Sequence, residues 1–263
     1  MTVPAEFDLQ AKRILLVGAT GVLGRAYAQA IAKTGAQLAI ADLSSSDVLT
    51  LADSIGAHGI EMDVTDEASV QAGVKAAIEE LGGLDGAISN AAATGEFLMK
   101  EGDPFTAFEE YPLAAWQKTI DVNLTGSFLV AREAGSAMKA SGGGSLVLVS
   151  SIYGVVGPDH SIYEDQPFKS FPGYSASKAG VIGLTRWLAT WWGDAGIRVN
   201  CLTPGGTYND HNESFAAAYG KRTPMGRMAE RDELTGMMMF LLSDASNYCT
   251  GQNYIVDGGF TSW

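Results

Sequence analysis

Three tyrosines precede Lys178 within a short stretch of the chain, and one of them is spaced for acid–base chemistry. A tyrosine hydroxyl has a pKa near ~10, so proton exchange at neutral pH requires lowering that pKa by ~3 units, or about 4 kcal/mol. A lysine ammonium at ~4 Å supplies about that much where the effective dielectric constant is ~20. Tyr174 and Lys178 lie four residues apart on one face of a predicted helix. Tyr153 and Tyr163 have a glycine and a proline at that spacing, so Tyr174 is the predicted acid–base residue.

The elements that must position this pair follow from the apolar pattern. Short runs rich in leucine and β-branched residues indicate strands buried on both faces, and segments with apolar residues at helical spacing alternate with them. This alternation predicts a doubly wound, parallel α/β sheet of about seven strands, the Rossmann arrangement, with helices on both faces. The predicted strands are 13–18, 37–42, 59–63, 84–90, 144–151, 197–204 and 253–259, and the predicted helices are 24–35, 66–82, 116–141 and 174–193.

Three segments, 92–113, 153–172 and 205–226, fit neither pattern, and each follows a predicted strand. In open α/β sheets ligands bind at the carboxyl ends of strands, where long loops commonly form walls or lids. We therefore expect these loops to surround a substrate, although a surface insertion without function is the alternative for any one of them. The 263 residues contain no linker or low-complexity run, so one domain is predicted over 1–263, its cofactor half covering about 10–150.

The turn after the first predicted strand contains Gly18, Gly21 and Gly24. Glycine lets the backbone turn tightly and approach a pyrophosphate at a helix N-terminus, and the position between a buried strand and a helix strengthens this weak signal. Asp42 ends the second predicted strand, where a carboxylate can accept hydrogen bonds from both ribose hydroxyls and repel the additional phosphate of NADP. Residues 43–46 include no Arg or Lys, so NAD is the predicted cofactor. An ordinary turn aspartate is the alternative.

Several short motifs follow one another in a specific order along the chain. They are the glycine turn, Asp42, Asp63-Val64, Asn90-Ala91-Ala92, Asn123 in DVNLTGSF, Ser151, Tyr174 with Lys178, Pro204-Gly205 and the terminal VDGG. With these motifs the chain resembles a single-domain short-chain dehydrogenase/reductase over nearly its whole length. Most members of that family oxidise a secondary alcohol or reduce its ketone. Many are tetramers, so the resemblance also implies a homo-oligomer, either a dimer or a homotetramer.

The resemblance implies roles for individual residues. Ser151 would hydrogen-bond the substrate oxygen, Lys178 would also hold the nicotinamide ribose, and Asn123 would anchor a water that relays protons to Lys178. A buried amide at a helix kink is the other role for Asn123. In similar proteins the catalytic serine precedes two residues and a glycine, which favours Ser151 over Ser150. The implied cofactor site is Gly18, Thr20, Gly21, Val22, Leu23, Gly24, Asp42, Leu43, Asp63, Val64, Asn90, Ala91, Ala92, Tyr174, Lys178, Pro204, Gly205 and Thr207, and the implied substrate site is Ser151, Tyr153, Tyr174 and Gly206.

Two features depart from the family pattern. Val17 and Val22 replace the threonine and the middle glycine of the usual turn, and the resulting glycine spacing is similar to that of the sugar-nucleotide branch. The gap between Ser151 and Tyr174 is longer than usual. These departures leave two alternative functions open: an NAD-binding redox sensor without turnover, and a sugar-nucleotide epimerase or dehydratase. Whether Tyr153 lines the pocket or only packs against it is also open.

The predicted substrate walls are Ala93–Phe97, Tyr153, the 157–172 insertion and Tyr208–Phe215. They carry many polar groups, and this mixture favours a sugar, sugar acid or polyol over a steroid or acyl chain. The polar residues are Glu96, His160, Glu164, Asp165, Asn209, Asp210, His211 and Asn212.

The amino-acid composition argues against several other classes of protein. With 17 basic and 30 acidic residues the net charge is −13, which argues against nucleic acids and anionic membranes as partners, though it can simply maintain solubility. Two cysteines cannot build a disulfide framework, and the N-terminus lacks the pattern of a signal peptide, so a cytoplasmic location is predicted. The three histidines have no metal-ligand spacing, and no metal is expected. Trp191 and Trp192 are expected at a core or subunit contact.

Overall fold

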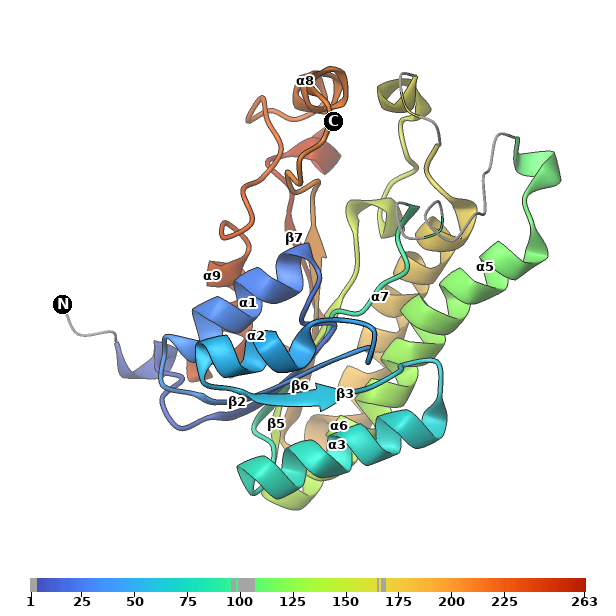
Figure 1. Cartoon of the computed structure of the whole chain (residues 1–263). Helices are drawn as coiled ribbons and strands as arrows, with labels where there is room; N and C mark the ends of the chain where they lie inside the picture. The colour runs from blue at the N-terminus through green and yellow to red at the C-terminus, as the bar shows by residue number, and fades with distance from the viewer. Residues whose placement is uncertain (1–3, 96–97, 99–106, 165, 167–168) are drawn as a thin grey trace.

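The computed structural model of the chain has one parallel sheet of seven strands (Figure 1). It describes residues 4–95, 98, 107–164, 166 and 169–263. The strand order β3-β2-β1-β4-β5-β6-β7 means that the chain builds one half from the centre to an edge, returns, and builds the other half. All seven predicted strands are confirmed. They are β1 (Arg13–Val17), β2 (Gln37–Asp42), β3 (His58–Glu61), β4 (Gly86–Ser89), β5 (Gly144–Val149), β6 (Ile197–Pro204) and β7 (Asn253–Val256).

Helices cover both faces of the sheet (Figure 1). One layer contains α1, α2 and α9, and the opposite layer contains α3, α6 and α7. The described helices are α1 (Val22–Ala32), α2 (Val48–Ile55), α3 (Glu67–Leu81), α5 (Leu113–Ile120), α6 (Gly126–Ser141), α7 (Pro172–Trp192), α8 (Glu213–Lys221) and α9 (Thr235–Leu242), and a π-helical turn, η3 (Asp121–Thr125), joins α5 to α6.

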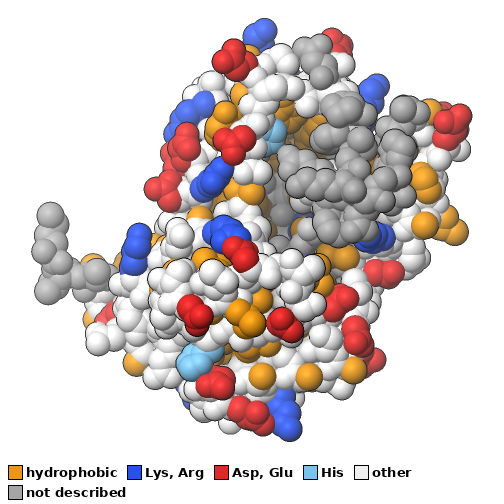
Figure 2. All heavy atoms as spheres, in the orientation of Figure 1, with side chains coloured by type: hydrophobic (Ala, Val, Ile, Leu, Met, Phe, Trp, Pro, Cys, Tyr) orange, Lys and Arg blue, Asp and Glu red, His pale blue; other side chains and the backbone are white. Residues whose placement is uncertain are grey.

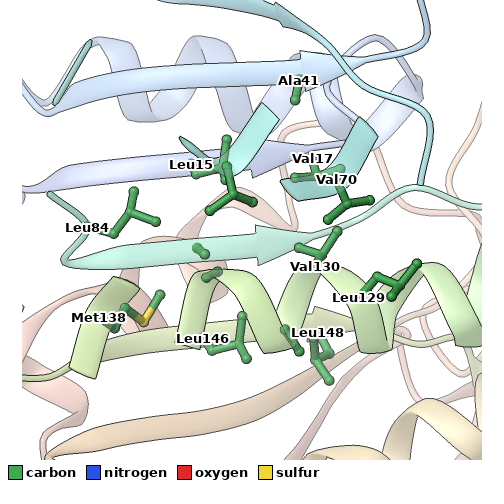
Figure 3. Close-up of a cluster of buried hydrophobic side chains, with 14 of the residues drawn as sticks. Leu15, Val17, Ala41, Val70, Leu84, Leu129, Val130, Met138, Leu146 and Leu148 are labelled. Carbon is green, nitrogen blue, oxygen red and sulfur yellow. The ribbon is translucent and has the colours of Figure 1, made fainter. Parts of the chain in front are cut away.

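Consecutive side chains of the central strands enter opposite layers of the core, because side chains alternate between the two faces of a strand. Ile14 and Leu16 of β1 pack in the layer of α1, α2 and α9, whereas Leu15 and Val17 pack in the layer of α3, α6 and α7. Figure 3 shows the second layer, where Leu15 and Val17 face side chains of α3 and α6. Burial on both faces explains why these strands are almost continuously apolar.

The helices agree with the sequence pattern in part. The segments predicted as 24–35, 66–82 and 174–193 form α1, α3 and α7, and the segment 116–141 is helical but interrupted by η3. Three helices, α2, α8 and α9, were not predicted, and α8 lies inside 205–226, so the prediction that this segment lacks a helical element was wrong. Its N-terminal signal is Asn212, whose side chain accepts a hydrogen bond from the Phe215 N–H at 2.8 Å.

Within the described residues, no helix has the length and apolar character needed to cross a membrane.

Candidate active site

The four predicted catalytic residues lie together at the carboxyl edge of the sheet. Ser151 follows β5, and its hydroxyl hydrogen-bonds Tyr174 on α7. Lys178 lies one helical turn further along α7 and donates from Nζ to the Val149 carbonyl at 2.8 Å. Asn123 lies in η3, which packs against α7. A strand end, one helix and a π-helical turn therefore determine the geometry of the site.

The neighbouring serine, Ser150, has a structural role. Its hydroxyl donates to the Lys178 carbonyl at 2.7 Å and is turned into the contact between β5 and α7. Gly154 fits against the same turn, because a Cβ there would lie 2.7 Å from the Lys178 carbonyl carbon. This close approach gives a physical reason for a glycine three residues after Ser151, and it leaves Ser151 as the serine that faces the cavity.

Lys178 is an ionisable group in a dry environment, with a residue exposure of only 2%. Burial lowers the pKa of its ammonium to about 8. Nζ lies 5.8 Å from the centroid of the Tyr174 ring. Lys178 therefore holds its proton at neutral pH and loses it only slightly above.

The pKa of the Tyr174 hydroxyl differs from the value expected from its lysine neighbour. Burial raises the pKa of the Tyr174 hydroxyl above its ordinary value, and the hydrogen bond from Ser151 opposes that rise. The expected net lowering is thus not present, because desolvation of the phenolate outweighs the hydrogen bond with Ser151. In this structure Tyr174 is a neutral hydroxyl at physiological pH.

Asn123 is fully buried, and its amide ties three parts of the site together. Its Oδ1 accepts from the Ala93 N–H at 2.7 Å, and its Nδ2 donates to the Ala93 carbonyl at 3.3 Å and to the Ser177 hydroxyl at 3.1 Å. The loop after β4 is thereby fixed to α7 beside Lys178. Asn123 is thus a buried amide within the π-helical turn, as its alternative role states, but the backbone that it satisfies is that of Ala93 rather than that of the turn itself.

A groove of about 440 Å³ runs along the carboxyl ends of β1, β2 and β4 toward Tyr174. It is lined by fifteen of the residues predicted to bind the cofactor: Gly18, Thr20, Gly21, Val22, Leu23, Asp42, Leu43, Asp63, Val64, Asn90, Ala91, Ala92, Tyr174, Lys178 and Pro204. Gly205 and Thr207 line the adjoining cavity instead, and Gly24 is a packing residue.

Two glycines allow the first turn to pack tightly. Gly18 has φ +83°, and a Cβ there would lie 2.3 Å from the Ala91 nitrogen. A Cβ at Gly24 would lie 2.1 Å from the Gly18 carbonyl oxygen, so only glycine lets α1 approach the turn this closely. Asn90 fixes the other side by donating from Nδ2 to the Gly18 carbonyl at 2.7 Å.

Asp42 organises the groove at the end of β2. Its Oδ2 accepts from the Thr20 N–H at 2.8 Å and from the Thr20 hydroxyl at 2.7 Å, and its Oδ1 accepts from the Leu43 N–H at 2.9 Å. A carboxylate has about four lone-pair sites, so it retains capacity for a further donor. The negative charge lies in the groove wall itself.

The groove and its far end fit a nicotinamide dinucleotide. The closely packed turn at Gly18 leaves the backbone accessible at the N-terminus of α1, which suits a pyrophosphate. In the adjoining cavity, Thr207 has a buried Oγ1 without a hydrogen-bond partner among the described residues, as expected where a polar ligand is bound. The residues near Gly18 therefore suit the pyrophosphate of a nicotinamide dinucleotide, and Thr207 offers a polar group for its other end.

A second cavity, of about 480 Å³, opens beyond Ser151 and Tyr174. Figure 2 shows the surface hollowed above this edge of the sheet, with charged side chains of both signs scattered around it. All four residues predicted to bind substrate line it: Ser151, Tyr153, Tyr174 and Gly206. Tyr153 is thus a lining residue, and its hydroxyl lies 2.9 Å from that of Tyr163, which lines the cavity as well.

The predicted walls agree with the cavity in part. Residues that line it are Thr94, Gly95, Asn209, Asp210, His211, Asn212 and Phe215. His160 and Glu164 were predicted as walls but are exposed and do not line the cavity, because η5 (His160–Tyr163) turns Tyr163 inward instead. Glu96, Phe97 and Asp165 lie outside the described residues.

Gln166, Ser170 and Phe171 line the cavity from within the predicted 157–172 wall, although they were not singled out there. Tyr219 and Met228, from α8 and the segment after it, lie outside the predicted walls. Tyr219 accepts a hydrogen bond from the Gly206 N–H at 2.5 Å. Its position depends on α8, the helix missed in the sequence, so spacing alone could not place it.

Across the described parts of the chain, no group of three or more His, Cys, Asp or Glu side chains is arranged to hold a metal ion.

Comparisons with known proteins agree with this geometry. A family model described as enoyl-(acyl carrier protein) reductase matches residues 18–261. The chain is 36% identical to a trans-4-hydroxycyclohexanecarboxylate dehydrogenase of Sinomonas cyclohexanicum, with 97% of this chain and 95% of that protein covered. It is 33% identical to a D-threitol dehydrogenase of Mycolicibacterium smegmatis, with 99% and 97% covered.

A solved structure with a similar fold is a short-chain type dehydrogenase/reductase from Mycobacterium marinum, with a TM-score of 0.85, 34% identity and 97% of each chain covered. Sequence, fold and the order of the site residues thus agree, and the chain belongs to the short-chain dehydrogenase/reductase family as an NAD(P)-dependent enzyme acting on CH–OH groups.

Proposed function

We propose that the protein is an NAD-dependent dehydrogenase that interconverts a polar secondary alcohol and its ketone. The observation that carries this proposal is the position of Ser151, Tyr174 and Lys178. Tyr174 lines both the dinucleotide groove and the second cavity, with Ser151 on one side and Lys178 on the other. A substrate carbon in the second cavity would thus lie next to the end of the groove.

The chain's own groups then have distinct roles. When bound, the cofactor supplies the hydride carrier at C4 of its nicotinamide ring. Ser151 donates a hydrogen bond to the substrate oxygen, and Tyr174 donates its hydroxyl proton to that oxygen during ketone reduction or accepts a proton during alcohol oxidation. Lys178 holds the nicotinamide ribose, and Asn123 anchors the water that relays protons. The pKa of Tyr174 is raised by burial, which favours the donor role at neutral pH.

The preference for NAD is supported by Asp42. Its carboxylate lies in the groove wall at the end of β2, where the adenosine ribose of a dinucleotide belongs in this fold. A phosphate on that ribose would meet a like charge, whereas the two hydroxyls of NAD would find an acceptor.

A polar substrate is supported by the second cavity. Its lining includes the hydroxyls of Tyr153 and Tyr163 and the side chains of Gln166 and His211. Two relatives named above act on a polyol and on a hydroxylated ring acid, which is consistent with such a lining.

The test is an absorbance assay at the reduced-nicotinamide band with NAD and NADP, against polyols, sugars, sugar acids, hydroxy acids and apolar ketones. We expect NAD-linked turnover of polar alcohols, and turnover of apolar ketones alone would contradict the proposal. Tyr174→Phe should reduce turnover by about 10³-fold while NADH binding, measured by fluorescence, is retained.

The two alternatives predict other results. A redox sensor would bind NADH but oxidise none of the alcohols, and an epimerase or dehydratase would retain NAD tightly and show no net change in absorbance. The two named relatives are dehydrogenases, which favours the dehydrogenase.

We also propose a cytoplasmic homo-oligomer, a dimer or tetramer. Both cysteines are free, which suits a reducing compartment. Trp192 packs against Gly135 of α6, whereas Trp191 is 64% exposed and stacks on Trp187 with ring centroids 5.2 Å apart. Two exposed tryptophans on α7 suit a subunit contact. Size-exclusion chromatography with light scattering gives the oligomeric state directly.

A further inference from the structure

The insertion between Ser151 and Tyr174 is anchored to the floor of the second cavity. The Tyr163 hydroxyl is hydrogen-bonded to that of Tyr153 at 2.9 Å, and the Tyr163 ring meets Phe215 edge-on with centroids 5.3 Å apart. Both tyrosines keep their protons, because burial raises the pKa of each, that of Tyr163 to about 12. The insertion is thus fixed by neutral groups inside the cavity.

A second anchor holds the start of the insertion. Asp159 accepts from the Ser161 N–H at 3.0 Å and thereby begins η5, and its other oxygen pairs with Arg222 Nε at 3.0 Å. Arg222 follows α8, so the insertion is attached to the opposite wall of the cavity as well. Two anchors on different elements define the course of the chain up to Tyr163.

Gln166 lies directly after these anchors. Its backbone N–H donates to the Tyr163 carbonyl at 3.0 Å, and its side chain lines the cavity together with Ser151 and Tyr174. Its Nε2 is buried and has no hydrogen-bond partner among the described residues. A buried donor without an acceptor is costly, so native structures seldom contain one unless a ligand or water completes it.

The charge of the lining indicates what kind of acceptor fits. Among the lining residues that the structure describes, Asp210 is the one charged side chain, and no Lys or Arg is present. The side chain of Asp210 is itself 90% exposed, and its carboxylate lies 3.6 Å from Arg231. A substrate carboxylate would meet no Lys or Arg in this lining, where His211 is the one side chain that can become cationic, whereas a hydroxyl or carbonyl oxygen needs only a neutral donor.

We propose that Gln166 is a substrate-binding residue that determines specificity. Its Nε2 donates a hydrogen bond to a second, uncharged oxygen of the substrate, away from the carbon that is oxidised. The enzyme then prefers neutral diols, polyols or sugars over simple alcohols and over hydroxy acids. This inference depends on the proposed function, because it assigns the substrate class of the same site.

The test compares three alcohols on each of two scaffolds: cyclohexanol, cyclohexane-1,4-diol and 4-hydroxycyclohexanecarboxylate, and then butan-2-ol, threitol and threonate. We expect wild-type kcat/KM to be about tenfold higher for the diol or polyol than for the matched simple alcohol, the ratio that one hydrogen bond provides. Gln166→Leu should remove this advantage by lowering kcat/KM for the diol or polyol about tenfold relative to the value for the matched simple alcohol. Gln166→Glu, which replaces the donor by an acceptor of the same shape, should act in the same way.

The matched control is Glu164→Leu, an exposed position of the same insertion that does not line the cavity. It should keep the wild-type ratio. Thermal unfolding and NADH binding of each variant show that the fold is intact.

An equal loss on both alcohols, an unchanged ratio in Gln166→Leu, or a wild-type preference for the carboxylate would overturn the inference alone. Absence of turnover with every alcohol in the wild type would overturn the proposed function, and this inference with it.

Discussion

The dinucleotide groove and the substrate cavity meet at Tyr174 but are built in different ways. The groove consists mainly of backbone and small residues at the ends of β1, β2 and β4, and its shape depends on close approaches such as Gly18 to Ala91. The cavity is walled by large side chains from the insertion, α8 and the segment after β6. One half of the site is thus built from a turn, and the other from side chains on loops.

This difference shows what each half can tolerate. Such a turn tolerates only glycine at these positions, because an added methyl group meets the backbone of a neighbouring turn. A cavity wall made of side chains tolerates many residue types, because a substitution changes one contact and leaves the others in place. We therefore expect changes in the groove to affect stability and cofactor binding, and changes in the cavity to affect the choice of substrate. The four predictions below test that separation.

The largest effect is expected for Gly24→Ala. The added Cβ would lie 2.1 Å from the Gly18 carbonyl oxygen, so α1 must shift away from the turn. Overpacking of this kind costs about 3 kcal/mol of unfolding free energy or more, and NADH affinity should fall with it. Denaturant unfolding and fluorescence titration measure both. Gly183→Ala is the control, since Gly183 lies in α7 with open space around it, and it should raise stability by about 0.5–1 kcal/mol. Equal behaviour of the two variants would contradict the tight turn.

Unfolding of Lys178→Met at a series of pH values tests whether Lys178, where the groove meets the cavity, is shielded from water. The pKa of Lys178 is lowered by burial to about 8, so between about pH 8 and pH 10.5 the unfolded chain binds more protons than the folded one. Stability contributed at this position is therefore least below pH 8 and rises with pH. We expect the difference in unfolding free energy, wild type minus variant, to rise by about 2 kcal/mol from pH 8 to pH 9.5. A flat difference would mean that water reaches Nζ.

Asp42→Asn tests whether charge in the groove selects the cofactor. The amide keeps the shape but removes the charge that would repel a ribose phosphate. We expect the NADP/NAD ratio of kcat/KM to rise about tenfold, while the ratio between two alcohols stays constant. Steady-state kinetics with both cofactors measures it. A change in alcohol preference would show that the two halves are not separable.

The smallest effect is expected for Tyr163→Phe. It removes the hydrogen bond to Tyr153 and leaves that hydroxyl buried, at a cost of about 1 kcal/mol in stability. KM for the alcohol should change several-fold, and NADH affinity should not. Tyr208→Phe, an exposed tyrosine that does not line the cavity, is the control. Weaker NADH binding in Tyr163→Phe would contradict the separation between the dinucleotide groove and the substrate cavity.

The same division explains what could be predicted from the sequence. The strands and the groove follow from local signals, because a buried parallel strand is apolar throughout and a tight turn requires glycine at fixed positions. Tyr174 and Lys178 were predictable because they lie one helical turn apart, and the structure places them beside Ser151.

The cavity wall was predictable only in outline. Tyr163 and Gln166 could be assigned to it as parts of the insertion, but which residues of the insertion face inward depends on its packing, and Tyr219 depends on α8. His160 was expected inside and is exposed, because the turn of η5 selects Tyr163 to face inward. The pKa of Tyr174 was expected to fall and is raised, because spacing shows a neighbouring lysine but does not show burial.

The attachment of β5 to α7 has a consequence for exchange of the loop between them. The Ser150 hydroxyl holds the Lys178 carbonyl, and Gly154 fits against the same turn, so the start of α7 is located by contacts that precede the insertion. The cost of closing a loop grows only slowly with its length. We therefore expect that the segment from Gly157 to Ser170 can be exchanged for a loop of another length or composition. Ser151, Tyr174 and Lys178 should keep their positions after such an exchange.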